Sequence, residues 1–113
     1  MLTLTAGRRG ASGPYPYSAL VPEAREFQTL MKKYQPEKVV SYASMESFIA
    51  AKILVEAIRR SGADPTRQKI WIQLDKMNSY DVGGFKVSFS PQSHTGSKFV
   101  KMTVIGRDCK LLR

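Results

Sequence analysis

The sequence predicts an α+β fold in which three helices come first and two to three β-strands follow. Between residues 22 and 78 the apolar residues recur at helical spacing, and after residue 80 they recur at every second position. Proline and glycine stand at the ends of the helical segments. The chain has 113 residues, which leaves room for one domain at most.

The N-terminal segment is expected to be irregular. Glycine or proline interrupts it at positions 7, 10, 13, 14 and 16. The alternation of Leu and Thr over residues 2–5 could form a short strand. We therefore assign residues 1–13 as an irregular segment that precedes the folded part.

The first helix is expected to begin at Pro22, because proline suits the first helical position. Glu23 and Glu26 complement the positive end of the helix dipole, and Pro36 stops the helix. One face is apolar and should pack on a core: Ala24, Phe27, Leu30, Met31 and Tyr34.

The second helix is expected to start between Ser41 and Ser44 and to end at Gly62. It is apolar on most sides, and its narrow polar stripe predicts the pairs Lys52–Glu56 and Glu56–Arg60. A helix this apolar is normally buried in a large protein. A chain of 113 residues can hardly cover it, so either a part of the structure is missing or a partner covers the helix.

A third helix should start with Asp64 as the N-cap and Pro65 at the first position, and end at Asn78–Ser79. Trp71 lies among its apolar residues and is expected in the core. Strands are then expected over residues 85–89, 99–105 and 109–112, with a turn at 81–84 and a polar loop at 90–97.

Composition excludes most hydrolytic enzymes. The chain has one cysteine, Cys109, and one histidine, His94. An internal disulfide is therefore impossible, and a zinc site or a Ser-His-Asp triad would have almost no candidate residues. Gly83-Gly84 precedes a strand and is no phosphate loop. We expect no enzyme, no metal and no cofactor.

The formal charge of +9 suggests nucleic acid or an anionic membrane as a partner, and Tyr15 and Tyr17 could stack on bases. The basic residues are scattered, however, and no run of five like charges occurs. A solvated basic face is the other interpretation. No apolar stretch is long enough to span a bilayer and the start is not a secretory signal, so the chain as written would be cytoplasmic.

An ordered series of motifs follows the three helical segments: Tyr80-Asp81-Val82-Gly83-Gly84, Phe89-Ser90-Pro91 and His94-Thr95-Gly96. Together with these segments, the series resembles the C-terminal part of periplasmic solute-binding proteins, in particular the branched-chain amino acid binding group of ABC transporters. Residues 41–62 resemble the long helix near the C-terminus of these proteins, and residues 22–34 resemble the helix before it.

This resemblance covers residues 14–113 and implies a single partial domain, an α+β fragment of a type I periplasmic binding protein whose parent fold is α/β. It implies a receptor portion for a branched-chain amino acid or a related small acid or amide, and membrane subunits of a transporter as partners. The parent family is periplasmic. The groups that hold an amino acid come largely from the absent first part, so we expect this chain alone not to be ligand-competent.

Three hypotheses stay open: this receptor portion, a small basic nucleic-acid-binding protein, and a structural fragment that self-associates. The sheet that covers the second helix in the family is absent here, so we expect a homo-oligomer.

Tyr42 and Glu46 are the candidate ligand-binding residues. By the resemblance, Tyr42 stands where family members can line the ligand cleft, and Glu46 could meet a ligand amino group. The alternatives are a half-buried tyrosine near a helix start and a partner of the helix dipole. His94 is expected to be a turn residue and Cys109 a small apolar strand residue, while Tyr15 and Tyr17 could line a cleft edge or pack under a loop.

Overall fold

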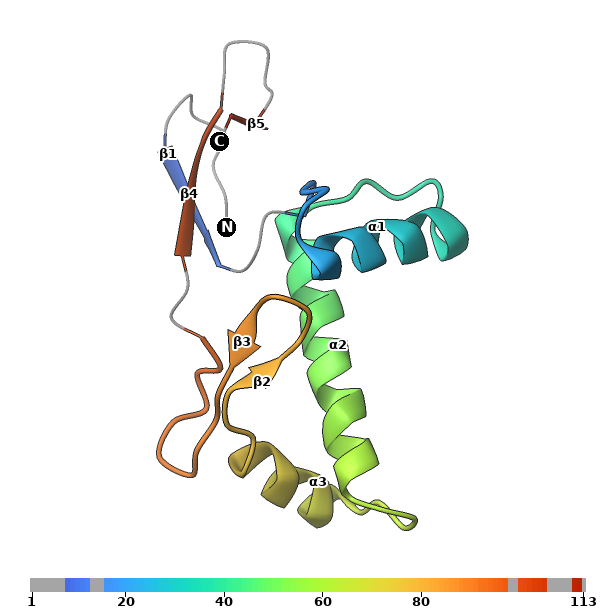
Figure 1. The fold of residues 1–113 in the computed structure, drawn as a ribbon, viewed down its shortest axis with the longest axis vertical. Coiled ribbons are helices and arrows are strands. Elements are labelled where there is room, and N and C mark those ends of the chain that lie inside the picture. Colours follow the sequence, from blue (N-terminus) through green and yellow to red (C-terminus); the bar gives the residue numbers. More distant parts are fainter. Residues whose placement is uncertain (1–7, 13–15, 98–99, 106–110, 113) are drawn as a thin grey trace.

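The computed structural model describes residues 8–12, 16–97, 100–105 and 111–112 (Figure 1). Three helices form the larger body, and two small sheets accompany them. The elements are β1 (Arg8–Ser12), α1 (Pro22–Tyr34), α2 (Tyr42–Arg60), α3 (Arg67–Asp75), β2 (Tyr80–Asp81), β3 (Lys86–Val87), β4 (Val100–Ile105) and β5 (Leu111–Leu112).

The predicted order of helices before strands is confirmed for α1 to β5, but the expectation of an irregular start is wrong for residues 8–12. Strand β1 pairs antiparallel with β4, from Arg8 opposite Val104 to Ser12 opposite Val100. Strand β5 pairs antiparallel with the other edge of β4. Strands β1 and β4 come from opposite ends of the chain, so their pairing leaves no signal between neighbouring residues in the sequence. Gly10 within β1 further weakens the pattern that would predict a strand there. Residues 2–5 lie outside the described residues.

Helices α1 and α2 begin where the sequence predicts. Val21 is the N-cap of α1 and Pro22 takes the first helical position. Ser41 caps α2 in a capping box, because its Oγ accepts from the Ser44 amide at 3.1 Å and its own amide donates to Ser44 Oγ at 2.9 Å. Two reciprocal bonds therefore fix the start of the 19-residue helix α2.

Helix α3 is shorter than the sequence predicts, and its cap differs. Thr66 is the N-cap, with Oγ1 accepting from the Lys69 amide at 3.2 Å, so the predicted cap at Asp64 is wrong. The helix ends at Asp75 because the chain then turns Met77 into the core, where its side chain is fully buried. The Met77 carbonyl accepts from the Phe89 amide at 2.8 Å, which ties this turn to the segment after β3.

The core lies where α1 crosses α2 and the β2–β3 hairpin packs against both. Phe27 of α1 and Phe48 of α2 place their rings 5.3 Å apart. The buried apolar residues come from all three elements and from the turn after α3: Ala24, Phe27, Met45, Ile49, Ala57, Met77, Val82 and Val87. This small core leaves much of α2 and α3 uncovered.

A turn of unusual backbone geometry closes the β2–β3 hairpin. Asp81 Oδ1 accepts from the amides of Gly83 and Gly84 at 2.8 and 2.6 Å, and these bonds hold the pKa of Asp81 below its ordinary value. Gly83 has φ +124°, and a Cβ there would lie 2.5 Å from Glu23 Oε2. Glycine is therefore required where the turn meets α1.

No described helix combines the length and the apolar character needed to cross a membrane.

Candidate functional site

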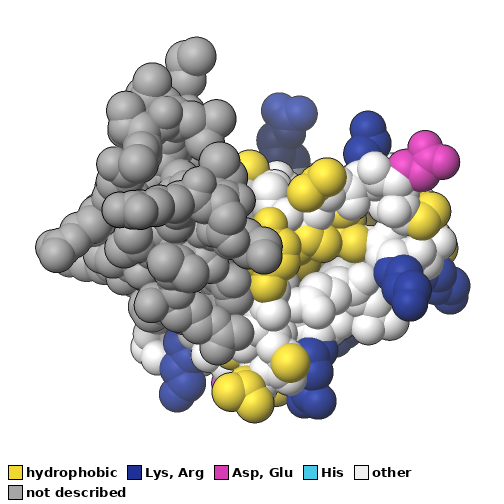
Figure 2. Space-filling view, turned by 90° about the horizontal axis from the view of Figure 1, so that it is seen from above, with side chains coloured by type: hydrophobic (Ala, Val, Ile, Leu, Met, Phe, Trp, Pro, Cys, Tyr) yellow, Lys and Arg dark blue, Asp and Glu magenta, His cyan; other side chains and the backbone are white. Residues whose placement is uncertain are grey.

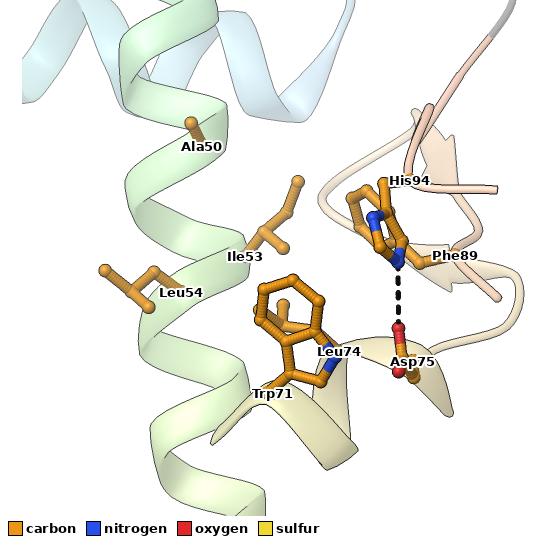
Figure 3. Close-up of a pocket in the computed structure, with 8 residues that line it drawn as sticks. All are labelled: Ala50, Ile53, Leu54, Trp71, Leu74, Asp75, Phe89 and His94. Carbon is orange, nitrogen blue, oxygen red and sulfur yellow. Dashed lines mark ion pairs between the residues drawn. The ribbon is translucent and has the colours of Figure 1, made fainter. Parts of the chain in front are cut away.

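The first candidate site is a pocket of about 340 Å³ between α2, α3 and the segment after β3 (Figure 3). Figure 3 shows Ile53, Trp71 and Phe89 pointing into the space between α2 and that segment. Most of the wall is apolar: Ala50, Ile53, Leu54, Trp71, Leu74 and Phe89. Such a wall suits an aliphatic or aromatic group.

Asp75 and His94 form the polar part of this pocket. His94 Nε2 lies 3.3 Å from Asp75 Oδ1, and the His94 ring meets the Trp71 ring edge to face at 5.3 Å between centroids. The sequence indicated only a turn residue at position 94, because neither partner is near it in the chain. The described lining residues include no serine, threonine or cysteine. The pair can therefore orient a polar group, and no hydroxyl or thiol nucleophile stands among the described residues that line this pocket.

Trp71 is not in the core, contrary to the prediction: 56% of the residue is exposed. Ile70 and Leu74 pack against the core instead. Successive residues of a helix point about 100° apart, so packing of Ile70 and Leu74 turns Trp71 and Ile72 outward. The apolar character of α3 is thus spread over two faces, and one of them is uncovered.

The second candidate site is a pocket of about 440 Å³ along the N-terminal half of α2. Glu46 lines it with an exposed side chain, opposite Phe85, Phe89 and the segment 94–97. Tyr42 is the first residue of α2 and is half-buried, and it does not line this pocket. The structure thus places Glu46 at a pocket and Tyr42 one helical turn away on the same helix.

An ion-pair cluster around the buried Glu23 carboxylate joins α1, α2 and the hairpin. Lys52 Nζ donates to Glu23 Oε2 at 2.9 Å, to Glu26 Oε2 at 2.7 Å and to the Val82 carbonyl at 3.0 Å. The predicted Lys52–Glu56 pair is therefore wrong, because Lys52 turns towards α1. Glu56 instead pairs with Arg60 at 2.9 Å, as predicted, and with Arg59 at 3.3 Å.

Burial is the main influence on the charges in this cluster. It raises the pKa of Glu23 above its ordinary value, and the hydrogen bond and ion pair with Lys52 only partly offset the rise. Burial also disfavours the Lys52 ammonium, but its bonds to Glu26 and Glu23 outweigh that cost and raise the pKa of Lys52. The cluster stabilises the arrangement of helices, and it lies outside both pocket walls.

The remaining candidates bear on nucleic-acid or metal binding. The Tyr17 hydroxyl donates to the Val40 carbonyl, which supports packing of the N-terminal loop. Tyr15 and Cys109 lie outside the described residues. Figure 2 shows Lys and Arg side chains spaced around the face seen from above, with apolar side chains between them. Among the described residues, no group of three His, Cys, Asp or Glu side chains could hold a metal ion.

Comparisons with known proteins identify the family. The family model for the periplasmic binding protein matches residues 3–109, so the match reaches into the segment before residue 14 that the sequence resemblance did not include. A substrate-binding periplasmic protein from Ralstonia solanacearum is 34% identical, with a TM-score of 0.82, over 93% of this chain and 30% of its own. No curated protein matches.

Two further solved structures are similar over nearly the whole chain. A possible leucine/isoleucine/valine-binding protein from Rhodopirellula baltica is 29% identical, with a TM-score of 0.84, over 94% of this chain and 29% of its own. An extracellular ligand-binding receptor from Verminephrobacter eiseniae is 28% identical, with a TM-score of 0.82, over 94% and 30%. This chain therefore spans only about 30% of the length of these proteins.

The helices and strands form a part of the type I periplasmic binding fold, as the sequence resemblance implied. A match over residues 3–109 and 34% identity to a solved relative lead to one conclusion. The chain belongs to the periplasmic binding protein family.

Proposed function

We propose that this chain is the C-terminal portion of an ABC-transporter solute receptor for branched-chain amino acids or related small acids and amides. The family match over residues 3–109 carries the proposal, and the name of the Rhodopirellula relative supports the ligand class. As in the parent family, the receptor would work in the periplasm with membrane subunits of a transporter and without catalysis.

Within such a receptor, we propose that Glu46 and Tyr42 contact the ligand. The Glu46 carboxylate can accept hydrogen bonds from a ligand ammonium group, which are among the stronger hydrogen bonds in proteins. The pocket beside it is lined by Phe85, Val87 and Phe89, whose apolar side chains suit an aliphatic ligand. Tyr42 lies one turn before Glu46 on α2, where its ring could cover one end of the ligand.

Residues 1–113 alone are proposed to bind such a ligand weakly or not at all. The chain spans about 30% of the length of its solved relatives, so most of a complete receptor lies outside it. Binding proteins of this kind close around a ligand by domain movement, which requires contacts from both sides. We also propose that the chain self-associates, because part of its apolar surface has no cover.

The test replaces the matched part of the Rhodopirellula protein with residues 3–109 and titrates leucine by calorimetry. We expect micromolar binding by the folded chimera and none by the chain alone. Glu46→Gln should weaken binding at least about tenfold, because a charge-assisted bond is lost. Glu37→Gln is the matched control, since Glu37 is an exposed carboxylate in the α1–α2 connection. Micromolar binding by the chain alone, or equal effects of both variants, would contradict the proposal.

A further inference from the structure

The turn of the β2–β3 hairpin lies directly on the first turn of α1. The Glu23 amide donates to the Gly83 carbonyl at 3.1 Å. A Cβ at Gly83 would lie 2.5 Å from Glu23 Oε2 and 3.2 Å from Glu23 Cβ, so the two backbones meet without room for a side chain between them. Amides in the first turn of a helix have no acceptor within the helix. Movement of the hairpin away from α1 would therefore break the bond of the Glu23 amide and uncover the Glu23 side chain.

Lys52 of α2 holds the same turn from a second helix. Its Nζ donates to the Val82 carbonyl at 3.0 Å and to Glu23 Oε2 at 2.9 Å. A third bond, at 2.7 Å, goes to Glu26 Oε2. The hairpin is thus held at two consecutive carbonyls, that of Val82 by α2 and that of Gly83 by α1.

The Glu23 carboxylate at the centre of these contacts is poorly solvated as an ion. Its side chain is completely buried, and among the described residues its Oε1 has no hydrogen-bond partner. An ionised carboxylate needs donors at both oxygens, and burial without them is costly. Lys52 supplies one donor, but it shares its charge with Glu26. A protonated Glu23 carries no charge and avoids most of this cost.

We propose that Glu23, Lys52 and the hairpin turn form a pH-sensitive latch, in which the turn packs on α1 most stably while Glu23 is protonated and opens more often once Glu23 is ionised. Opening admits water to the carboxylate, which stabilises the ionised form far more than the neutral form. Three charged groups face Glu23: Lys52 from α2, Glu26 from α1 and Asp81 from the hairpin. Of these, Lys52 favours the ionised form and the two carboxylates oppose it.

The direction of the pH dependence follows from these contacts. The pKa of Glu23 has its ordinary value when the latch is open, and burial raises this pKa when the latch is closed. The closed state is therefore most stable below the ordinary pKa, and it loses stability as the pH rises through the raised pKa.

The latch positions one wall of the second pocket. Phe85 and Val87 belong to the hairpin and line that pocket together with Glu46 of α2. Opening of the turn would therefore move the apolar wall that lies opposite Glu46. The residues of the latch lie outside both pocket walls, so this inference does not depend on which ligand the pocket binds.

The experiment follows amide hydrogen exchange in residues 1–113 by nuclear magnetic resonance, from about pH 4 to about pH 8. Each rate is divided by that of an unfolded peptide of the same sequence to give a protection factor. The Glu23 amide reports on the latch, because its bond goes to the Gly83 carbonyl. The Ser44 amide is the matched control, since it also lies in the first turn of a helix but bonds to Ser41 Oγ at 3.1 Å. We expect the protection of the Glu23 amide to fall at least about threefold across this range, and that of the Ser44 amide to change less than about twofold.

Two variants assign the titration to one carboxyl group. Glu23→Gln has the shape of the protonated acid and cannot ionise, so protection at residue 23 should stay high at every pH. Glu26→Gln is the control variant, because Glu26 accepts from the same Lys52 ammonium but its side chain is 49% exposed. It should keep the fall in protection at Glu23 that the unchanged chain shows.

Every other result overturns the latch. Constant protection of the Glu23 amide would show that its seating does not depend on protonation, and protection that rises with pH would show that the ion pair with Lys52 outweighs burial. An equal fall at Ser44 would indicate a change of the whole fold. A fall that Glu23→Gln retains, or that Glu26→Gln abolishes, would assign the titration to another group. If circular dichroism shows that Glu23→Gln does not fold, the profile of the unchanged chain and of Glu26→Gln decides.

Discussion

Replacing Lys52 with methionine removes the cation that neutralises a fully buried carboxylate. Lys52 bonds to Glu23 Oε2 at 2.9 Å and to Glu26 Oε2 at 2.7 Å; the Glu23 side chain is completely buried and that of Glu26 is half exposed. Breaking a buried ion pair at one partner costs about 3–5 kcal/mol. Since Lys52 itself is partly exposed, we expect Lys52→Met to lose about 3 kcal/mol of unfolding free energy. Urea unfolding followed by far-ultraviolet circular dichroism measures the loss.

Two further variants separate the effect of burying the Glu23 carboxylate from the effect of the exposed ion pair between Lys52 and Glu26. Glu26→Gln removes the exposed partner of Lys52 and should cost less than about 1 kcal/mol, as exposed pairs do. Adding Glu23→Gln to Lys52→Met removes the buried carboxylate that has lost its cation, and it should recover part of the lost unfolding free energy. A cost of less than about 1 kcal/mol for Lys52→Met, or a cost of Glu26→Gln as large as that of Lys52→Met, would show that the pairing of Lys52 with the buried Glu23 does not stabilise the fold.

The same variant should have a characteristic dependence on pH. Lys52 lowers the pKa of Glu23, so its removal raises that pKa further above the ordinary value. When folding raises the pKa of a carboxyl group, the folded protein loses stability as the pH rises from the pKa of the unfolded state through the pKa of the folded state. The stability lost by Lys52→Met should therefore be smaller at about pH 5 than at about pH 8. A loss that grows towards acid pH would contradict the assigned burial of Glu23.

Other predictions concern the turns, the caps and the pocket. Gly83→Ala should cost at least about 2 kcal/mol by thermal unfolding, because its φ is +124° and its Cβ would meet a buried carboxylate; Gly62→Ala, at φ +84° with open space around it, should cost only about 1 kcal/mol. Ser41→Ala should cost about 1 kcal/mol by the same assay through loss of the α2 cap, and an unchanged melting temperature would argue against the capping box. His94→Ala should change the fluorescence of Trp71, whose ring it contacts, while stability changes by less than about 1 kcal/mol. Unchanged fluorescence would contradict that contact.

Local signals in the sequence predicted the helices well. The start of α1 at Pro22 and the span of α2 follow from proline, the serine cap and the charges of the last turn, all of which act within a few residues. The predicted start of α3 was wrong because Asp64 and Thr66 are both residue types that suit an N-cap, and in the structure Thr66 takes that position. The apolar excess of α2 correctly indicated an uncovered surface, since Leu54, Val55 and Ile58 are exposed.

Contacts between distant segments could not be predicted from these signals. The pairing of β1 with β4, the contact of His94 with Asp75 and the turn of Lys52 towards Glu23 all join residues that are far apart in the chain. At the site, the sequence could not show that Glu46 lines a pocket while Tyr42 does not, because both lie on α2 and the pocket wall comes from the hairpin and the segment after it. The apolar residues of α3 are adjacent in the sequence, so the sequence likewise could not show which of them face the core.

The solvent accessibility of Trp71 shows whether residues 1–113 form a partial fold that leaves part of α3 uncovered. Trp71 is the chain's single tryptophan and 56% of it is exposed, so acrylamide quenching of its fluorescence reports on that side of α3. We expect strong quenching of the chain in dilute solution. Protection from quenching at every concentration, in a chain that light scattering shows to be monomeric, would mean instead that residues 1–113 close their own core.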